Sequence, residues 1–254
     1  MTSEESLEFA AALIADARSV VVFTGAGVSA ESGIPTYRTG TDGLWSAQNM
    51  QRFANPAGYR ANLLEAYQWY RARAEGVASA QPNSAHVAIV ELERVVPRMT
   101  LVTQNIDSLH QRAGSREVLE LHGNLRCVRC DACSSRVPWT EAPADPCCTG
   151  CGGMLRPEVV MFGDLLPEQA YVAAHAAAES CDVLISVGTS SQVFPASGLP
   201  LAALVGGAWV IVVNPEIDGQ PTHEQVLPLP GAAGQLMPDL VRRAAARKAA
   251  RAHG

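Results

Sequence analysis

Two pairs of cysteines have the residue type and the spacing that bind a metal ion. They form the motifs Cys127-x-x-Cys130 and Cys148-x-x-Cys151. A CxxC turn can aim two thiolates at one point, and two such turns can complete a tetrahedron around Zn²⁺. That closed shell leaves no position for a substrate, so we expect one structural Zn²⁺ and place the chemistry elsewhere in the chain.

Three further cysteines are not expected to be the main ligands. Cys147 could compete with its neighbour Cys148, whereas Cys133 and Cys181 are interpreted as ordinary small residues. The first ten residues carry three glutamates and lack the basic end and apolar core of a signal peptide. Seven cysteines in such a chain favour metal binding in a reducing compartment over disulfides, and we expect a cytoplasmic protein.

A glycine-rich turn is the first candidate for nucleotide chemistry. Residues Gly25–Ala30 match the pattern G-x-G-x-x-G/A directly after a predicted strand. Glycines in this position let the backbone approach a pyrophosphate. A tight strand-to-helix turn also needs glycine, so the motif alone leaves both interpretations open.

The sequence after this turn counts against hydride transfer. A dehydrogenase needs a second strand that ends in Asp or Glu about 20 residues on, to bind the adenosine ribose. Here Gly33–Arg38 and two more glycines follow, and no hydrophobic strand appears in time. A ribose carboxylate could come instead from Glu216 in Asn214–Glu216, and Gly188–Ser190 offers hydroxyls at another strand end.

Alternating strands and helices must position these groups. Buried strands are predicted at 19–24, 99–103, 117–121, 159–162, 183–187 and 208–213. Helices are predicted around 7–14, from Asn83 or Ser84 to 96, over 167–179 and from about Pro238 onward. The segment between Asp182 and Glu216 has no charged residue, but prolines and glycines interrupt it. We interpret it as two buried parallel strands and not as a membrane span.

This order of elements predicts an α/β fold with a doubly wound, parallel, Rossmann-like sheet and a smaller inserted domain. The sheet domain is expected to comprise residues 1–38, 82–125 and 156–254. Residues 39–81, a helical module rich in Tyr, Trp and Arg, and residues 126–155, the zinc ribbon, are assigned to the small domain. A cleft between the two domains would hold the ligand.

Composition narrows the partners. A chain of 254 residues with 48% hydrophobic and 17% charged residues can bury a substantial core. The net charge of −6 argues against general nucleic-acid binding, because no overall positive field attracts phosphate. The basic segment 242–251 is interpreted as a solvated C-terminal helix. We expect a monomer that binds neither a specific nucleic acid nor a membrane.

Taken together, the motifs resemble the sirtuins, a family of NAD-dependent protein-lysine deacylases. The segments that carry the resemblance occur in the family's order and span nearly the whole chain. They are Gly25–Arg38, Thr103–His110, Leu121–Gly123, the two CxxC pairs, Leu155–Gly163, Gly188–Ser190 and Asn214–Glu216.

The resemblance implies that NAD lies in the cleft and that His122, Asn105 and Asp107 are catalytic. His122 would be the general base, a role that suits an imidazole because it titrates near neutral pH. The residues that the resemblance assigns to the cofactor are Gly25, Ala26, Gly27, Ser29, Ala30, Pro35, Thr36, Arg38, Gln104, Asn105, Ile106, Asp107, Gly188, Thr189, Ser190, Asn214, Glu216 and Ala233.

The implied reaction transfers the acyl group of a modified lysine to the ribose of NAD. Its products are free lysine, nicotinamide and O-acyl-ADP-ribose. The segment Val159–Gly163 would pair with a substrate protein or peptide as an added strand, with Val160, Met161, Phe162 and Gly163 as contacts. Met161 departs from the family, in which an aromatic residue is common at this position.

Tyr70 and Arg73 have the Y-x-x-R spacing of the family branch that removes succinyl and malonyl groups. A guanidinium can bind the terminal carboxylate of a succinyl group through two hydrogen bonds, and a phenol can add another. Arg71 is the competing arginine, and an exposed cationic helix face is the alternative interpretation. Acetyl groups would be removed secondarily.

Other functions stay open at this point. They are a deacetylase without preference for acidic acyl groups, a mono-ADP-ribosyltransferase, an NAD-dependent oxidoreductase, and a zinc-containing binding module without catalysis. The missing second-strand carboxylate weakens the oxidoreductase, and the acidic net charge weakens a nucleic-acid-binding module.

Overall fold

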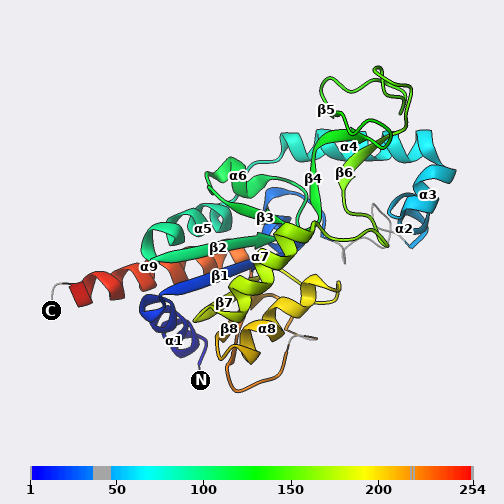
Figure 1. The fold of residues 1–254 in the computed structure, drawn as a ribbon. Helices are drawn as coiled ribbons and strands as arrows, with labels where there is room; N and C mark the ends of the chain where they lie inside the picture. The colour runs from blue at the N-terminus through cyan, green and yellow to red at the C-terminus, as the bar shows by residue number, and fades with distance from the viewer. Residues whose placement is uncertain (1, 37–46, 218, 220, 253–254) are drawn as a thin grey trace.

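Six parallel strands form the main sheet (Figure 1), in the order β3-β2-β1-β7-β8-β9. The computed structural model describes residues 2–36, 47–217, 219 and 221–252. The expected fold class is confirmed. The strands are β1 (Ser19–Thr24), β2 (Arg98–Thr103), β3 (Val118–Glu120), β7 (Val183–Val187), β8 (Trp209–Asn214) and β9 (Val226–Pro230).

The two central strands, β1 and β7, are buried along their whole length. Their runs of valine, isoleucine and phenylalanine suit a strand that is covered by helices on both faces. The chain builds outward from β1 through β2 to β3, and then from β7 through β8 to β9 on the other side. Between β1 and β7 the strand order therefore reverses, and such a switch point is where open α/β sheets bind ligands.

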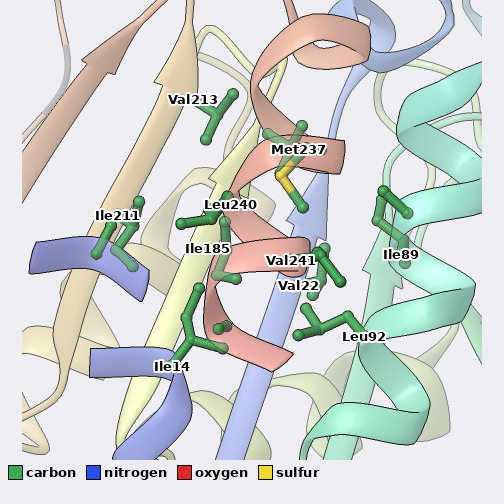
Figure 2. Close-up of a cluster of buried hydrophobic side chains, with 14 of the residues drawn as sticks. Ile14, Val22, Ile89, Leu92, Ile185, Ile211, Val213, Met237, Leu240 and Val241 are labelled. Carbon is green, nitrogen blue, oxygen red and sulfur yellow. The ribbon is translucent and has the colours of Figure 1, made fainter. Parts of the chain in front are cut away.

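Helices α1 (Ser3–Asp16), α5 (Ser84–Val95) and α9 (Ala233–Ala252) cover one face of the sheet. Figure 2 shows Met237, Leu240 and Val241 of α9 pointing between the strands and the other two helices. Helices α7 (Glu168–Glu179) and α8 (Leu199–Val205) pack on the opposite face through a second apolar cluster. Three short helices complete this part of the chain: η1 (Ala26–Ser32), α6 (Leu109–Ala113) and η2 (Ala196–Gly198).

A second group of elements lies at one end of the parallel sheet (Figure 1). Among the described residues, it contains a three-stranded antiparallel sheet in the order β5-β4-β6 and three helices. They share one hydrophobic cluster that includes Tyr59, Tyr67 and Tyr70, and the Tyr59 hydroxyl donates to the Leu155 carbonyl over 2.9 Å. The elements are α2 (Ala47–Phe53), α3 (Pro56–Ala61), α4 (Leu63–Ser79), β4 (Gly123–Cys130), β5 (Arg136–Pro138) and β6 (Leu155–Val159).

The last helix begins at Ala233, so the expected start near Pro238 is wrong. A proline inside a helix cannot donate to the carbonyl four residues earlier. That carbonyl belongs to Gly234, and the Ser84 hydroxyl donates to it over 2.7 Å instead. The replacement hydrogen bond comes from α5, a helix distant in sequence, which is why the local pattern did not predict it.

Three strands were missed and one was placed wrongly. The expected strand 159–162 is wrong, because β6 ends at Val159. Strand β9 was missed because its sequence, Val-Leu-Pro-Leu-Pro, contains two prolines, which are tolerated at the edge of a sheet where β9 lies. Strands β4 and β5 were missed because they surround the cysteine motif. Among the described residues, no helix combines the length and the apolar character needed to cross a membrane.

Candidate functional site

Two glycine turns interlock where β1 and β7 end. The Gly27 amide donates to the Gly188 carbonyl over 2.8 Å, and a Cβ on Gly27 would lie 2.7 Å from the Gly188 Cα. Gly188 has a φ of +61°, and a Cβ there would lie 2.3 Å from the Val28 nitrogen. The glycines are therefore required by the approach of one turn to the other. This packing requirement for glycine applies whether or not a nucleotide binds at these strand ends.

A buried polar cluster lies behind the first turn. The Ser29 hydroxyl donates to the Asp107 carboxylate over 2.8 Å, and the Asn105 side-chain amide donates to the Ser29 oxygen and to the Gly25 carbonyl, both over 3.1 Å. Burial raises the pKa of Asp107, while the Leu109 amide and the Ser29 hydroxyl lower it less. These contacts fix three side chains at the carboxyl ends of β1 and β2.

Gln104 connects the ends of two strands. Its side-chain amide donates to the Thr189 hydroxyl over 2.8 Å, and its backbone amide donates to the Thr24 carbonyl over 3.0 Å. The residues predicted from β2 and β7 are thus brought together at the switch point. Ser190 follows them and is half-buried.

His122 lies between β3 and β4, and its ring is held by the backbone. Its Nδ1 is 2.9 Å from the Gln104 carbonyl oxygen. Burial lowers the pKa of His122, and this hydrogen bond opposes the shift only in part. The imidazole is therefore neutral at pH 7, and its Nε2 is the free proton acceptor. The arrangement can perform general-base chemistry.

The remaining predicted cofactor residues lie around the same edge of the sheet. Asn214 ends β8, and its side-chain amide donates to the Glu216 carbonyl. Ala233 is buried at the start of α9, where the Gly234 amide donates to the Glu31 carboxylate over 2.6 Å. The other predicted positions are Ala26 and Ala30 in η1, Pro35 and Thr36 after it, Ile106 after β2, and Arg38, which lies outside the described residues.

The predicted substrate segment continues from β6, the edge strand of the small sheet. The Val160 amide donates to the His122 carbonyl over 2.9 Å, and the Phe162 amide donates to the Ala54 carbonyl over 2.8 Å. Met161 is buried, Phe162 is 45% exposed, and Gly163 has a φ of +94°. Hydrogen bonds from this segment thus reach both the histidine and the helical module.

Asp164 fixes the end of this segment. Its carboxylate accepts from the Arg156 guanidinium over 2.5 Å and from the Met161 amide over 3.1 Å. Arg156 is 8% exposed, so this ion pair is largely shielded from water. The Asp164 carboxylate thus binds both Arg156 in β6 and Met161 in the segment, and these two contacts fix the conformation of the segment.

Tyr70 and Arg73 lie on α4, near this segment. Tyr70 is 2% exposed, and burial raises the pKa of its phenol; the charges of Arg73, Arg156 and Asp164 also act on it. Arg73 stacks over the Trp69 ring and donates to the Trp69 carbonyl over 3.1 Å. Burial lowers the pKa of Arg73 to about 9, so the guanidinium is still charged at pH 7.

Arg71, the competing arginine, serves the small module. Its guanidinium donates to the carbonyls of Ala142, over 3.0 Å, and Pro143. It also lies over the rings of Tyr67 and Trp139, at 5.4 and 5.7 Å from their centroids. These contacts tie α4 to the loop after β5.

Four thiols gather in the small module, but they are not the four that were predicted. Their Sγ atoms lie within 4.8 Å of one another, with separations of 3.5 Å for Cys130–Cys151 and 3.8 Å for Cys133–Cys148. A tetrahedron with Zn–S bonds of ~2.3 Å has S···S edges of ~3.8 Å. The set fits one structural Zn²⁺, held by Cys130, Cys133, Cys148 and Cys151.

The prediction that Cys127 is a ligand is therefore wrong, as is the interpretation of Cys133 as an ordinary small residue. Cys127 and Cys130 both lie in β4, three positions apart, and side chains at that spacing point to opposite faces of a strand. The turn after β4 instead aims Cys130 and Cys133 at one point. Cys147 is outside the cluster, and its thiol contacts the Gly152 carbonyl.

Two supporting groups were missed. Asn83, expected only to cap α5, also donates from its side chain to the Val28 carbonyl over 2.8 Å and to the Ser32 hydroxyl over 3.0 Å. It thereby holds η1. Asparagine is common at helix starts, so nothing in the sequence distinguished this second role.

The second missed group is a pair of buried histidines behind the strand ends. Nε2 of His110 lies 2.9 Å from the Thr24 hydroxyl, which donates to Thr103 over 2.9 Å. The rings of His86 and His110 are 4.8 Å apart. Burial lowers the pKa of His86 to about 4 and that of His110 to about 3, so both are neutral.

Comparisons with known proteins agree with this geometry. A sequence model of the Sir2 family matches residues 25–195. NAD-dependent protein deacylase 1 of Pseudomonas aeruginosa is 46% identical over 242 residues, which cover 91% of this chain and 96% of that protein. A solved Sir2 homolog–NAD complex has a TM-score of 0.83 and 43% identity, with 98% of this chain and 95% of that chain covered. Sir2Af2 bound to a myristoylated histone peptide has a TM-score of 0.77 and 34% identity, with 99% and 100% covered.

Proposed function

Because the chain belongs to the Sir2 family and is an NAD-dependent protein deacylase, we propose that it removes succinyl and malonyl groups from protein lysines, and acetyl groups secondarily. The observation that carries this preference is Arg73. It is a charged, partly buried guanidinium beside the Tyr70 phenol, on a helix next to the segment Val160–Gly163. A cation in such surroundings favours an anionic group over a neutral one, because water screens it weakly.

The alternative arginine supports the same choice. Arg71 already binds two backbone carbonyls and stacks on two rings, so an acyl carboxylate would have to displace these contacts. To bind the carboxylate through a charge-assisted pair of hydrogen bonds, Arg73 would have to release the Trp69 carbonyl, and Tyr70 would add a third bond from its hydroxyl. An acetyl group lacks the carboxylate and gains none of these bonds.

We further propose catalytic roles for the residues around the switch point. When bound, NAD supplies the glycosidic bond whose cleavage makes the ribose carbon electrophilic. His122 accepts a proton from a ribose hydroxyl at Nε2, since its Nδ1 is occupied by the Gln104 carbonyl. Asn105 and Asp107 orient the nicotinamide half, and the buried hydrogen bonds with Ser29 keep both side chains in place.

The substrate is proposed to be an acyl-lysine peptide that adds a strand beside Val160–Gly163. The related Sir2Af2 structure contains an acylated histone peptide, which supports this class of partner. Main-chain hydrogen bonds would supply affinity without requiring one peptide sequence.

A comparison of acyl groups on one peptide tests the preference. We expect Arg73→Met to lower kcat/KM for a succinyl-lysine peptide roughly 10- to 100-fold more than for the acetyl form, since charge-assisted bonds contribute ~1.5–3 kcal/mol. Arg71→Met is the matched control, because it removes a guanidinium from the same helix and should leave the ratio unchanged. Equal losses on both peptides with Arg73→Met would instead support a deacetylase without acidic-acyl preference.

A further inference from the structure

The chain contains a single lysine. Of its 19 basic residues, 18 are arginines, and only Lys248 carries an amine side chain. A lysine amine can be acylated by a thioester after it loses a proton, whereas a guanidinium in a protein stays protonated. A protein that removes acyl groups from lysines therefore has one side chain of its own that can carry such a group.

Lys248 binds a different helix from its arginine neighbours. Near the end of α9, two arginines pair with carboxylates of α1, whereas the Lys248 amine donates to the backbone carbonyl of Val95 in α5. The arginine pairs are Arg247–Glu8 and Arg251–Asp16. Planar guanidinium groups suit carboxylates, and a compact ammonium suits a single carbonyl oxygen. Among these three cationic contacts, only the one with α5 can be chemically modified by acylation.

The acceptor is an end group of α5. Val95 is the last residue of that helix, and carbonyls in the last turn have no partner within their own helix. A cation there also interacts favourably with the negative end of the helix dipole. Acylation would remove both the charge and its attraction to this end of α5.

We propose that Lys248 is an acylation site at which the protein is both target and enzyme. The deprotonated amine attacks the carbonyl carbon of an acyl thioester. A C–N bond forms, the C–S bond breaks, and the thiol leaves with the second amine proton. The product is a neutral amide, which lacks the charge that holds this part of α9 at the end of α5.

The reverse step uses the family's own activity on a second molecule. Acyl-Lys248, NAD and water are converted to the free amine, nicotinamide and O-acyl-ADP-ribose. Lys248 lies in the last turns of α9, and helix ends unwind at low cost. Once the contact with Val95 is lost, this end is still paired with α1 through Arg247–Glu8 and Arg251–Asp16, but such exposed ion pairs contribute little. The end can therefore enter the substrate site of another copy as an extended segment.

The first experiment measures whether Lys248 is acetylated and whether acetylation destabilises the protein. The protein is incubated with acetyl-CoA without NAD, and its peptides are mapped by mass spectrometry. We expect Lys248 to be the acetylated side chain and the melting temperature to fall by about 2–4 °C. Lys248→Gln should reproduce this fall, and Lys248→Arg, which keeps a charge and a donor, should not. An unlabelled Lys248, or acetylation that leaves the melting temperature unchanged, overturns the proposal.

The second experiment separates this proposal from the enzyme's general activity. Acetylated His122→Ala protein is the substrate, and active Lys248→Arg protein, which has no lysine, is the enzyme. A free acetyl-lysine peptide is included in the same NAD-containing reaction. We expect acetyl groups to leave both the peptide and Lys248. If acetyl groups leave the peptide but not Lys248, the inference is overturned and the deacylase function stands. If acetyl groups leave neither substrate, the deacylase activity on which the inference rests is itself contradicted.

Discussion

The Nδ1 of His122 lies 2.9 Å from the backbone oxygen of Gln104. A carbonyl oxygen only accepts, so Nδ1 carries a hydrogen and the neutral ring keeps its lone pair on Nε2. Burial lowers the pKa of this imidazole below its ordinary value of 6.5. The site thus contains a base that is unprotonated at neutral pH and has one defined accepting atom.

The pH dependence of the reaction should reflect that lowered pKa. Because the neutral imidazole is the active form, kcat/KM should be constant above the pKa of His122 and fall as the pH drops through it. We expect the midpoint of this acidic limb to lie below pH 6.5, measured with an acyl-lysine peptide at saturating NAD.

Gln104→Ala provides the control for this assignment. The backbone carbonyl that binds His122 is retained, whereas the side-chain bond to Thr189 is lost. The midpoint of the limb should stay in place even if the rate changes. A midpoint above pH 6.5 in the unmodified protein would contradict a buried, neutral base.

Stability at acidic pH should depend on His86 and His110. Burial lowers their pKa values from 6.5 to about 4 and about 3. Below pH 6.5 these two histidines bind protons in the unfolded chain but stay neutral in the folded chain. The free energy of unfolding therefore falls as the pH drops toward 4. The expected slope is ~1.4 kcal/mol per pH unit for each histidine.

Urea unfolding between pH 7 and pH 4 measures this slope. His110→Gln should lower the free energy of unfolding at pH 7, because the contact with Thr24 is weakened. It should also reduce the dependence of this free energy on pH by about the contribution of one histidine. His175→Gln is the matched control, since the side chain of His175 on α7 is 41% exposed. A slope that is the same in all three proteins would show that the buried pair does not control acid sensitivity.

Short sequence patterns were sufficient to predict most strands of the main sheet and the turns that follow them. Five of the six strands of the parallel sheet, the turns at Gly25 and Gly188 and the position of His122 at a strand end follow from apolar runs that end in glycine or polar residues. Parallel strands bring such ends to one edge of the sheet, and Gln104 and Thr189 meet at that edge.

Contacts between segments distant in sequence were not predictable in this way. Cys130 belongs to two overlapping CxxC motifs, and only the length of β4 decides that Cys133 and not Cys127 completes the zinc site. Similarly, Pro238 is accommodated in α9 because Ser84 satisfies the carbonyl that the proline leaves unbonded. In both cases, structure outside the motif selects between two locally acceptable arrangements.

Two cysteine substitutions should separate the two possible ligand sets. Cys133→Ser removes a ligand and should reduce the bound zinc, measured by elemental analysis, and lower the melting temperature. Cys127→Ser should retain one zinc per chain, since its thiol lies outside the cluster. Zinc lost from Cys127→Ser and kept by Cys133→Ser would restore the original assignment.

Interlocking of the two glycine turns predicts a large effect from one added methyl group. Gly188→Ala would place a Cβ 2.3 Å from the Val28 nitrogen at a φ of +61°. We expect it to lower the free energy of unfolding by more than ~2 kcal/mol and to weaken NAD binding, because the turn at Gly25 must shift.

Gly76→Ala is the control: Gly76 lies within α4, and a Cβ there would meet nothing within 4 Å. This change should raise stability by ~0.5–1 kcal/mol. If calorimetry and NAD titration gave the two variants the same stability and affinity, close packing of the turns would not be what requires glycine at position 188.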